Sequence, residues 1–353
     1  MNETDEVDLT LANDAVLVRG GRFQTPPELR DLVRDLSRLR NAPVALALCT
    51  DWAAAIALVW FAGRFGTWWS WFPLAFLVGT RQHAIGVLMH DGAHYRLHPD
   101  RTWSERISDW FTAYPLFITT DGYRVNHFAH HRYLNTTKDP DWMVKKGNAD
   151  WEFPKSPPSF ALVVVRQWFG GGLVTNLRRY SKGATGSPGD KADPAARRST
   201  YLDRWAFYFV VAAALTVVGG WRPFLLYWVL PYMTFLPMLL RIRSVGEHFG
   251  MQWTSDLDMS RSTESDWAEK ILLLPHNVHF HLDHHLFPSV PFYNLGMLHK
   301  ALLTMPGFPE QAHISRGYFT SAPTSLIADL AGKRKRSTRT CLTRQESLPC
   351  AID

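Results

Sequence analysis

Histidine is concentrated in three short windows, residues 90–94, 127–131 and 281–285, which hold eight of the 15 histidines. Random placement would put about 0.6 histidines there. The first window has the spacing i, i+4, and the other two have i, i+3, i+4. On a helix these positions share one face, with about 5–6 Å between Cβ atoms. The eight residues are His90, His94, His127, His130, His131, His281, His284 and His285.

Imidazoles in such numbers indicate a metal centre. Neutral imidazole is a good ligand for iron, zinc, copper and nickel. Eight imidazoles exceed what a single four-coordinate zinc ion uses, so two metal ions are the simplest way to employ them. His248, which follows Glu247, is a ninth candidate ligand.

Few carboxylates lie within the windows, so we expect carboxylates to orient imidazoles rather than to bind metal. Soluble di-iron bundles differ, because they use Glu and Glu-x-x-His ligands. The side chains expected to orient the imidazoles are Asp91, Asp139, Asp141, Glu247, Asp283 and Asn277. The other histidines are interpreted as structural or surface residues, with His276 and His279 near enough to the third window to support it; they are His83, His98, His276, His279, His299 and His313.

Four apolar runs could carry these windows to one place. They predict an all-α integral membrane protein with four transmembrane helices and a cytosolic helical cap that holds the metal site. The first run matches a hydrocarbon core of about 30 Å, and Asp51 within it should face other helices, since a central carboxylate costs roughly 2.5–3.5 kcal/mol on insertion. The runs are residues 44–63, 72–89, 205–220 and 224–240.

The distribution of positive charge supports this topology. The chain has 353 residues, 46% of them apolar, and a formal net charge of +6. Of its 38 Lys and Arg, all but Arg64, Arg81 and Arg222 lie in the N-terminal, middle or C-terminal segments. Four spans place these segments on one side, as the positive-inside rule expects. The same side receives all three histidine windows.

The predicted organisation has three parts. Residues 1–43 form an N-terminal cytosolic or interfacial segment, with an amphipathic helix over residues 27–40 that lies in solvent or on an anionic membrane surface. Residues 44–305 form the membrane domain and its cap. Residues 306–353 form a cytosolic tail whose last part is predicted to be disordered.

The histidine windows resemble the three histidine boxes of the membrane fatty acid desaturase family. The surrounding sequence agrees: residues 81–83 read Arg-Gln-His before the first box, residues 139–141 read Asp-Pro-Asp after the second, and residues 288–291 read Pro-Ser-Val-Pro after the third. The similarity covers roughly residues 45 to 305. The i, i+4 spacing of the first box is closer to acyl-lipid desaturases and carotenoid-modifying relatives. Ser244 stands where acyl-CoA desaturases have an Asn that binds metal through water, so an acyl-CoA substrate is disfavoured.

This resemblance implies a non-heme di-iron centre that activates O₂ and removes hydrogen from an unactivated C–H bond. By position, the eight box histidines and His248 would be the nine ligands. Since the sequence has no cytochrome b5-like segment, electrons should come from a separate donor, a ferredoxin or an NAD(P)H-dependent reductase. The other expected partner is membrane lipid, with no nucleic acid. The expected location is a bacterial inner membrane, with both termini and the active site cytosolic.

Several functions remain open at this point. The favoured one is an O₂-dependent desaturase acting on an acyl chain or a similar apolar, lipid-like substrate. A hydroxylase or ketolase of the carotenoid type would share the boxes, and so would a desaturase of a small amino-acid-derived metabolite. A membrane metal-binding protein without redox chemistry is disfavoured, because its ligands would follow a path through the bilayer.

Overall fold

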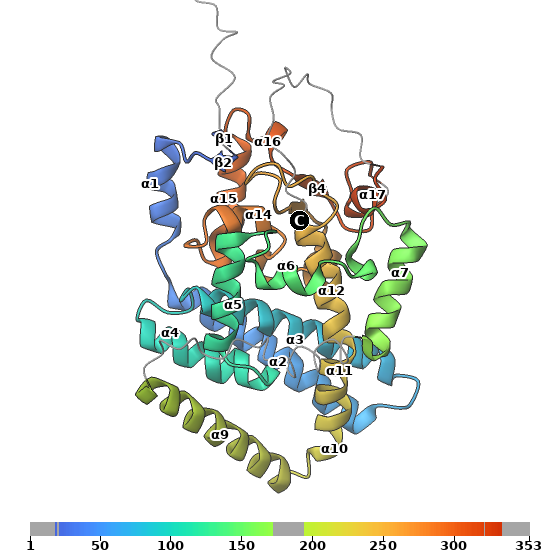
Figure 1. Ribbon diagram of the computed structural model, residues 1–353. Coiled ribbons are helices and arrows are strands. Elements are labelled where there is room, and N and C mark those ends of the chain that lie inside the picture. Colours follow the sequence, from blue (N-terminus) through green and yellow to red (C-terminus); the bar gives the residue numbers. More distant parts are fainter. Residues whose placement is uncertain (1–17, 20, 172–193, 321, 334–353) are drawn as a thin grey trace, which may run out of the picture.

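The computed structural model describes residues 18–19, 21–171, 194–320 and 322–333, and these are mostly helical (Figure 1). The α-helices are α1 (Pro27–Leu36), α2 (Asn41–Phe65), α3 (Trp71–Ala93), α4 (Arg101–Ser108), α5 (Thr120–Tyr133), α6 (Pro140–Lys145), α7 (Pro157–Arg166), α9 (Pro194–Val217), α10 (Trp221–Phe224), α11 (Leu230–Met233), α12 (Phe235–His248), α13 (Trp267–Leu272), α14 (His281–Leu286), α15 (Phe292–Leu303), α16 (Phe308–Gln311) and α17 (Leu326–Leu330).

Shorter elements join these helices. The π and 3-10 turns are η1 (Asp109–Ala113), η2 (Tyr114–Leu116), η3 (Ala149–Trp151), η4 (Gln167–Gly171), η5 (Leu225–Val229) and η6 (Pro275–Asn277). The strands are β1 (Val18–Arg19), β2 (Arg22–Phe23), β3 (Ser262–Glu264) and β4 (Ile314–Arg316). β1 pairs antiparallel with β2, and β3 pairs parallel with β4.

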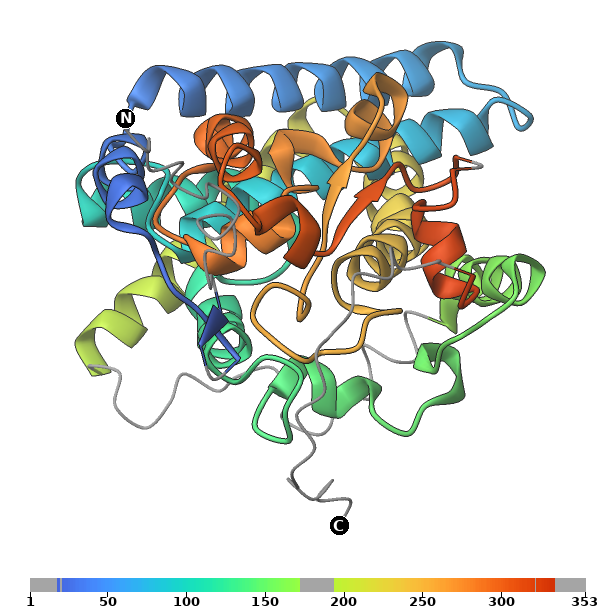
Figure 2. The ribbon, with the colours of Figure 1, turned by 90° about the horizontal axis from the view of Figure 1, so that it is seen from above.

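The long helices α2 and α3 lie side by side (Figure 2). Most of α2 is exposed and apolar, with Ile56 and Trp60 more than half exposed. Only a narrow stripe of α2 is buried, formed by Val44, Ala47, Asp51, Ala55 and Ala62. A helix that buries one stripe and exposes apolar side chains elsewhere is suited to contact with lipid.

Two helical stretches among the described residues are long and apolar enough to cross a membrane. They are α2 and the continuous stretch from Trp221 to His248, which comprises α10, η5, α11 and α12. The other two predicted runs fall in α3 and α9. Arg81 and His83 interrupt α3, and Asp203 and Arg204 shorten the apolar part of α9. The four-span arrangement therefore stays a prediction.

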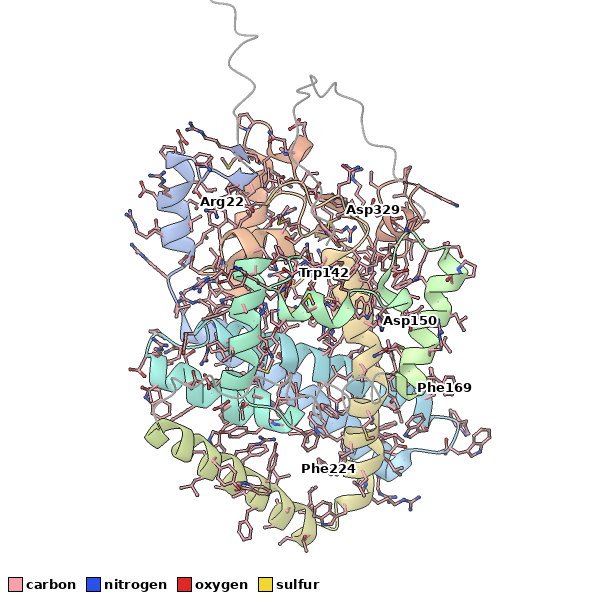
Figure 3. The ribbon with its side chains drawn as sticks, viewed as in Figure 1. Arg22, Trp142, Asp150, Phe169, Phe224 and Asp329 are labelled. Atoms are coloured by element: carbon pink, nitrogen blue, oxygen red, sulfur yellow. The ribbon has the colours of Figure 1, made fainter. Side chains whose placement is uncertain are left out.

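Close packing fixes α12 against α3. A Cβ added at Gly79 of α3 would lie 2.7 Å from the Cβ of Phe235, so the close approach of α12 depends on this glycine. At the other end of α12 the ring of Trp142 in α6 lies 6.0 Å from that of Phe249. Figure 3 shows Phe224 of α10 and Trp142 toward opposite ends of this helical column.

Asp51 faces other elements of the protein, as predicted. Its carboxylate is buried and accepts from Arg81 Nη1 of α3 at 3.0 Å and from His276 Nε2 of η6 at 2.6 Å. These bonds supply the partners that a carboxylate within an apolar helix requires. They also connect α2 to the segment that leads into the third histidine box.

The N-terminal helix is shorter than predicted, since α1 ends at Leu36 rather than at residue 40. Leu29 and Leu36 join a core with Leu295 and Leu298 of α15. The arginines of α1 are exposed on its other side, where Arg34 pairs with Asp31. Packing on the cap therefore accounts for the amphipathic pattern.

The cap extends beyond residue 305. Phe308, Tyr318 and Leu326 are fully buried, and β4 pairs with β3. In Figure 1, α14 to α17 lie above α2 and α3, whereas α9 lies below them. The disorder predicted from about residue 331 falls mostly on residues 334–353, which lie outside the described residues.

Candidate metal centre

The nine predicted histidines converge into two groups. In each group the ring nitrogens that could bind metal lie within 4.8 Å of one another. The first cluster is His90, His94, His127, His131 and His284. The second cluster is His130, His248, His281 and His285.

Helical geometry explains how neighbouring residues reach different clusters. Successive residues on an α-helix are rotated by about 100°, whereas residues four apart share a face. On α5, His127 and His131 join the first cluster, and His130 joins the second. On α14, His281 and His285 join the second cluster, and His284 joins the first.

The distances between ring nitrogens fit metal binding. For ligands at right angles with bonds of about 2.1 Å, adjacent nitrogens lie about 3 Å apart. The Nε2–Nε2 distances in the first cluster are 2.8 Å for His94–His127, 3.1 Å for His127–His131 and 3.1 Å for His131–His284. In the second cluster they are 3.2 Å for His130–His248, 3.0 Å for His248–His281 and 3.0 Å for His281–His285.

Burial keeps these imidazoles in the form that binds metal. Burial, aided by Arg96 and Arg124, lowers the pKa of His94 to about 3. Burial, aided by His94 and His130, lowers the pKa of His131 to about 2. Neutral rings with free lone pairs at physiological pH are metal ligands, whereas protonated rings are not.

Helix ends add a favourable field for a cation. His90 lies in the last turn of α3, His130 and His131 lie in the last turn of α5, and His248 is the last residue of α12. A helix C-terminus carries partial negative charge from its unpaired carbonyl groups. Three such ends converge on the clusters, so the site favours positive charge.

Two members of the second cluster donate a hydrogen bond from their other ring nitrogen, and a third has a carboxylate nearby. His130 Nδ1 donates to Asp139 at 2.9 Å, and His248 Nδ1 donates to the carbonyl of Met259 at 3.3 Å. His281 Nδ1 lies 3.3 Å from Glu247 but makes no hydrogen bond with the described residues. Such partners fix the tautomer and direct Nε2 toward the metal position.

The remaining predicted orienting residues are placed differently. Asp91 lies 3.5 Å from His90 Nδ1 and accepts from the Phe292 amide. Asp141 pairs with Lys145, and Asp283 accepts from His299 and Ser262. Asn277 donates to the carbonyl of Phe292. The structure thus does not bring Asp141, Asp283 or Asn277 into a hydrogen bond with any imidazole of the clusters.

Histidines outside the boxes have varied surroundings. His276, His299 and His313 pair with Asp51, Asp283 and Asp329, which fits the structural role expected for them. His83 and His279 are buried, and neither ring has a hydrogen-bond partner among the described residues.

Sequence reasoning missed three residues beside the clusters. Tyr123 stacks on His127, with ring centroids 5.1 Å apart. Arg243 donates to Glu247 at 2.6 Å, and Lys145 donates to Ser244 at 2.6 Å. The i, i+4 spacing of Arg243 and Glu247 on one helix is the signal that could have identified that pair.

Comparison with known proteins agrees with this site. The family model described as "Fatty acid desaturase" matches residues 66–316, which include every histidine of both clusters. The chain is 29% identical to dihydrorhizobitoxine desaturase of Bradyrhizobium elkanii, over 92% of this chain and 94% of that protein. It is 21% identical to the sn-1 acyl-lipid omega-3 desaturase (ferredoxin) of Nostoc sp. (strain 36), over 71% and 73%. It is 24% identical to the acyl-lipid omega-3 desaturase (cytochrome b5) of Arabidopsis thaliana, over 71% and 68%.

Proposed function

We propose that this chain, which belongs to the fatty acid desaturase family, is an O₂-dependent desaturase whose nine clustered histidines hold two iron ions. The observation that carries the proposal is the division of the histidines into groups of five and four with converging ring nitrogens. In such a reaction the substrate loses two hydrogens. O₂ takes up these hydrogens with two electrons from a donor and two protons, and two waters form.

The residues present fit iron. An imidazole-rich set suits iron, zinc, copper or nickel by donor type, and family membership favours iron. The buried ring nitrogens of His90 have no hydrogen-bond partner among the described residues, which is costly unless a metal takes up a lone pair. Iron held here would supply the O₂ activation that attack on an unactivated C–H bond requires.

The chain's own part in catalysis is to hold and orient. Asp139 accepts the Nδ1 proton of His130, and Glu247 faces Nδ1 of His281, so both rings present Nε2 to the second cluster. The packing of α3, α5, α12 and α14 buries most of the cluster rings and limits the access of bulk water. A restricted, oriented site of this kind protects a reactive oxidant from side reactions.

For the membrane we propose the arrangement expected from the sequence. α2 and the 221–248 stretch cross the bilayer, with α3 and α9 contributing two further spans. Residues 44–305 then form the membrane domain and most of its cap, after an interfacial segment over residues 1–43. In the C-terminal segment, residues 306–353, the part up to Leu330 packs on the cap. The clusters and both termini lie on the cytosolic side of a bacterial inner membrane. The exposed apolar surface of α2 supports contact with lipid.

A separate protein would deliver the electrons. Relatives are named for ferredoxin and for cytochrome b5, so a small soluble carrier is the class of donor we propose. A ferredoxin or an NAD(P)H-dependent reductase meets this requirement.

The substrate has two candidates. Acyl lipids are the substrates named for several relatives. The alternative is a small metabolite, and it is favoured by the similarity to a desaturase named for dihydrorhizobitoxine, which extends over 92% of this chain.

Product mass tests the reaction. Cells expressing the wild type should contain a product two hydrogens lighter than its precursor, and cells expressing His284→Ala should not. A product heavier by one oxygen would instead identify a hydroxylase or ketolase. Both the desaturase and the hydroxylase or ketolase would be contradicted by a purified protein that binds metal but consumes no O₂ when it is given a reductant and an extract of the host cells.

A further inference from the structure

The C-terminal half of α12 places charged residues beside the metal centre. Arg243 precedes Glu247 by one helical turn and His248 by five residues, a rise of about 7.5 Å. These charges follow the apolar part of a helix that is long enough to span a membrane. Ionisable residues in such a segment mark functional positions, because they are expensive to place there.

The hydrogen bonding of Arg243 is incomplete. A guanidinium carries five N–H donors. The Nε of Arg243 donates to Glu247, while its Nη groups have no protein acceptor among the described residues. The side chain is only 11% exposed, so these donors are largely withdrawn from bulk water. Leaving them unpaired is unfavourable.

Arg124 provides the contrast, since its side chain is similarly buried at 8% exposed. Its Nε donates to the carbonyl of Ala93, and its Nη groups donate to Glu105, Asp121 and the carbonyl of Gly92. Arg124 is therefore satisfied by the protein, as a structural arginine should be. Arg243 is equipped to receive an additional anionic partner.

Arg243 lies where such a partner would meet the metal centre. Its partner Glu247, which accepts from Arg243 Nε at 2.6 Å, lies 3.3 Å from Nδ1 of His281 and precedes His248 in the chain. An anion bound by the Nη groups would thus lie close to the second cluster.

The neighbouring residues are also charged or polar. Lys145 is buried and donates to Asp141 and to Ser244, which precedes Glu247 by about one turn of α12. An acyl chain threaded past these groups would remove charges from water without replacing their hydrogen bonds. A compact polar molecule would meet them with hydrogen bonds of its own.

We propose that Arg243 binds the carboxylate of a small polar substrate, such as an α-amino acid, and so places C–H bonds a few atoms from that carboxylate beside the metal centre. This inference rests on the proposed desaturase function and narrows its substrate class. Guanidinium and carboxylate make a bidentate, charge-assisted pair, which gives orientation as well as affinity. In a membrane acyl lipid the carboxyl group of the acyl chain is esterified and carries no charge for this contact.

Binding to the iron-loaded protein in lipid nanodiscs tests the contact. The probes are unbranched α-amino acids of increasing length, and each is compared with its own methyl ester. Binding is measured as the shift in the midpoint temperature of thermal unfolding, followed until it saturates with probe concentration. At least one amino acid should bind the wild type more tightly than its ester. The variant Arg243→Gln, whose amide can still donate to Glu247, should weaken that binding about tenfold or more while retaining iron.

Two further variants separate binding from structure. Arg243→Lys should retain part of the binding, because lysine keeps the positive charge. It should not restore the full affinity, because an ammonium group cannot form the bidentate pair of a guanidinium. Arg241→Gln should bind the amino acid as the wild type does, because Arg241 lies two residues, or about 200°, around α12 from Arg243 and stacks on Trp151. The proposal is overturned if every amino acid binds no better than its ester, or if Arg243→Gln binds the amino acid as tightly as the wild type does.

The products distinguish this inference from the function on which it rests. Extracts of cells expressing the wild type or His284→Ala are divided into lipids and polar carboxylic acids, and each fraction is searched by mass spectrometry. A product two hydrogens lighter among the polar acids supports the inference. The same change among the lipids overturns it and leaves the desaturase function intact. No such change in either fraction contradicts the proposed function itself.

Discussion

The two histidine clusters contain similar ligands and are held in different ways. The second cluster has four imidazoles, of which two donate a hydrogen bond from Nδ1 and a third, His281, has Glu247 3.3 Å from its Nδ1. The first cluster has five imidazoles, and its nearest such neighbours among the described residues are Asp91 and the Tyr123 hydroxyl, both at 3.5 Å. The first cluster therefore depends on the number of its ligands and on packing, and the second depends on oriented rings.

Removing one ligand from each cluster should have the largest effect. His284→Ala and His285→Ala change adjacent residues of α14, yet each should empty a different metal position. Each should lower turnover by more than about 100-fold, which is the largest loss typical of mutating a residue that only orients a ligand. Mössbauer spectra of ⁵⁷Fe-loaded protein should lose different iron signals in the two variants. His98→Ala, outside both clusters, is the matched control, and identical spectra for the two ligand variants would refute the division into five and four.

Asp139→Asn should have the next largest effect and act on the second cluster. Asn keeps the N-cap of α6 and removes the charge that faces His130. The expected loss is about 10- to 100-fold in metal affinity, measured by iron release to a chelator. The iron bound by the first cluster should be released at the wild-type rate.

Asp91→Asn applies the same test to the first cluster. Asn can still accept from the Phe292 amide, so the local fold should persist. Because Asp91 is 3.5 Å from His90 Nδ1, iron loss from the first cluster should rise by less than about tenfold. A larger effect than that of Asp139→Asn would show that the first cluster also depends on an oriented ring.

Tyr123→Phe should have the smallest effect. Phenylalanine keeps the stacking on His127 and removes a hydroxyl that lies 3.5 Å from Nδ1, beyond a good hydrogen bond. Iron release should change by about threefold or less. A loss as large as that of Asp139→Asn would mean that the hydroxyl holds the ring of His127.

The ligand candidates could be selected from the sequence because their spacing is local. Positions four apart on a helix share a face, so each box already indicated neighbouring imidazoles. The division between clusters was not predicted, since it depends on how α3, α5, α12 and α14 pack. The same holds for Asp283, whose partner His299 lies on another helix.

The membrane topology was predicted less completely for a related reason. Hydropathy identifies α2 and the 221–248 stretch. In α3, Arg81 is partly buried and pairs with Asp51, and His83 is fully buried by other parts of the protein. A hydropathy average counts both residues against a span, although the pairing of Arg81 and the burial of His83 keep them away from lipid.

Anomalous diffraction at the iron absorption edge, from crystals of the iron-loaded protein, tests the central claim most directly. The account predicts two peaks, one bounded by His90, His94, His127, His131 and His284, and the other by His130, His248, His281 and His285. A single peak, or peaks away from these rings, would contradict it.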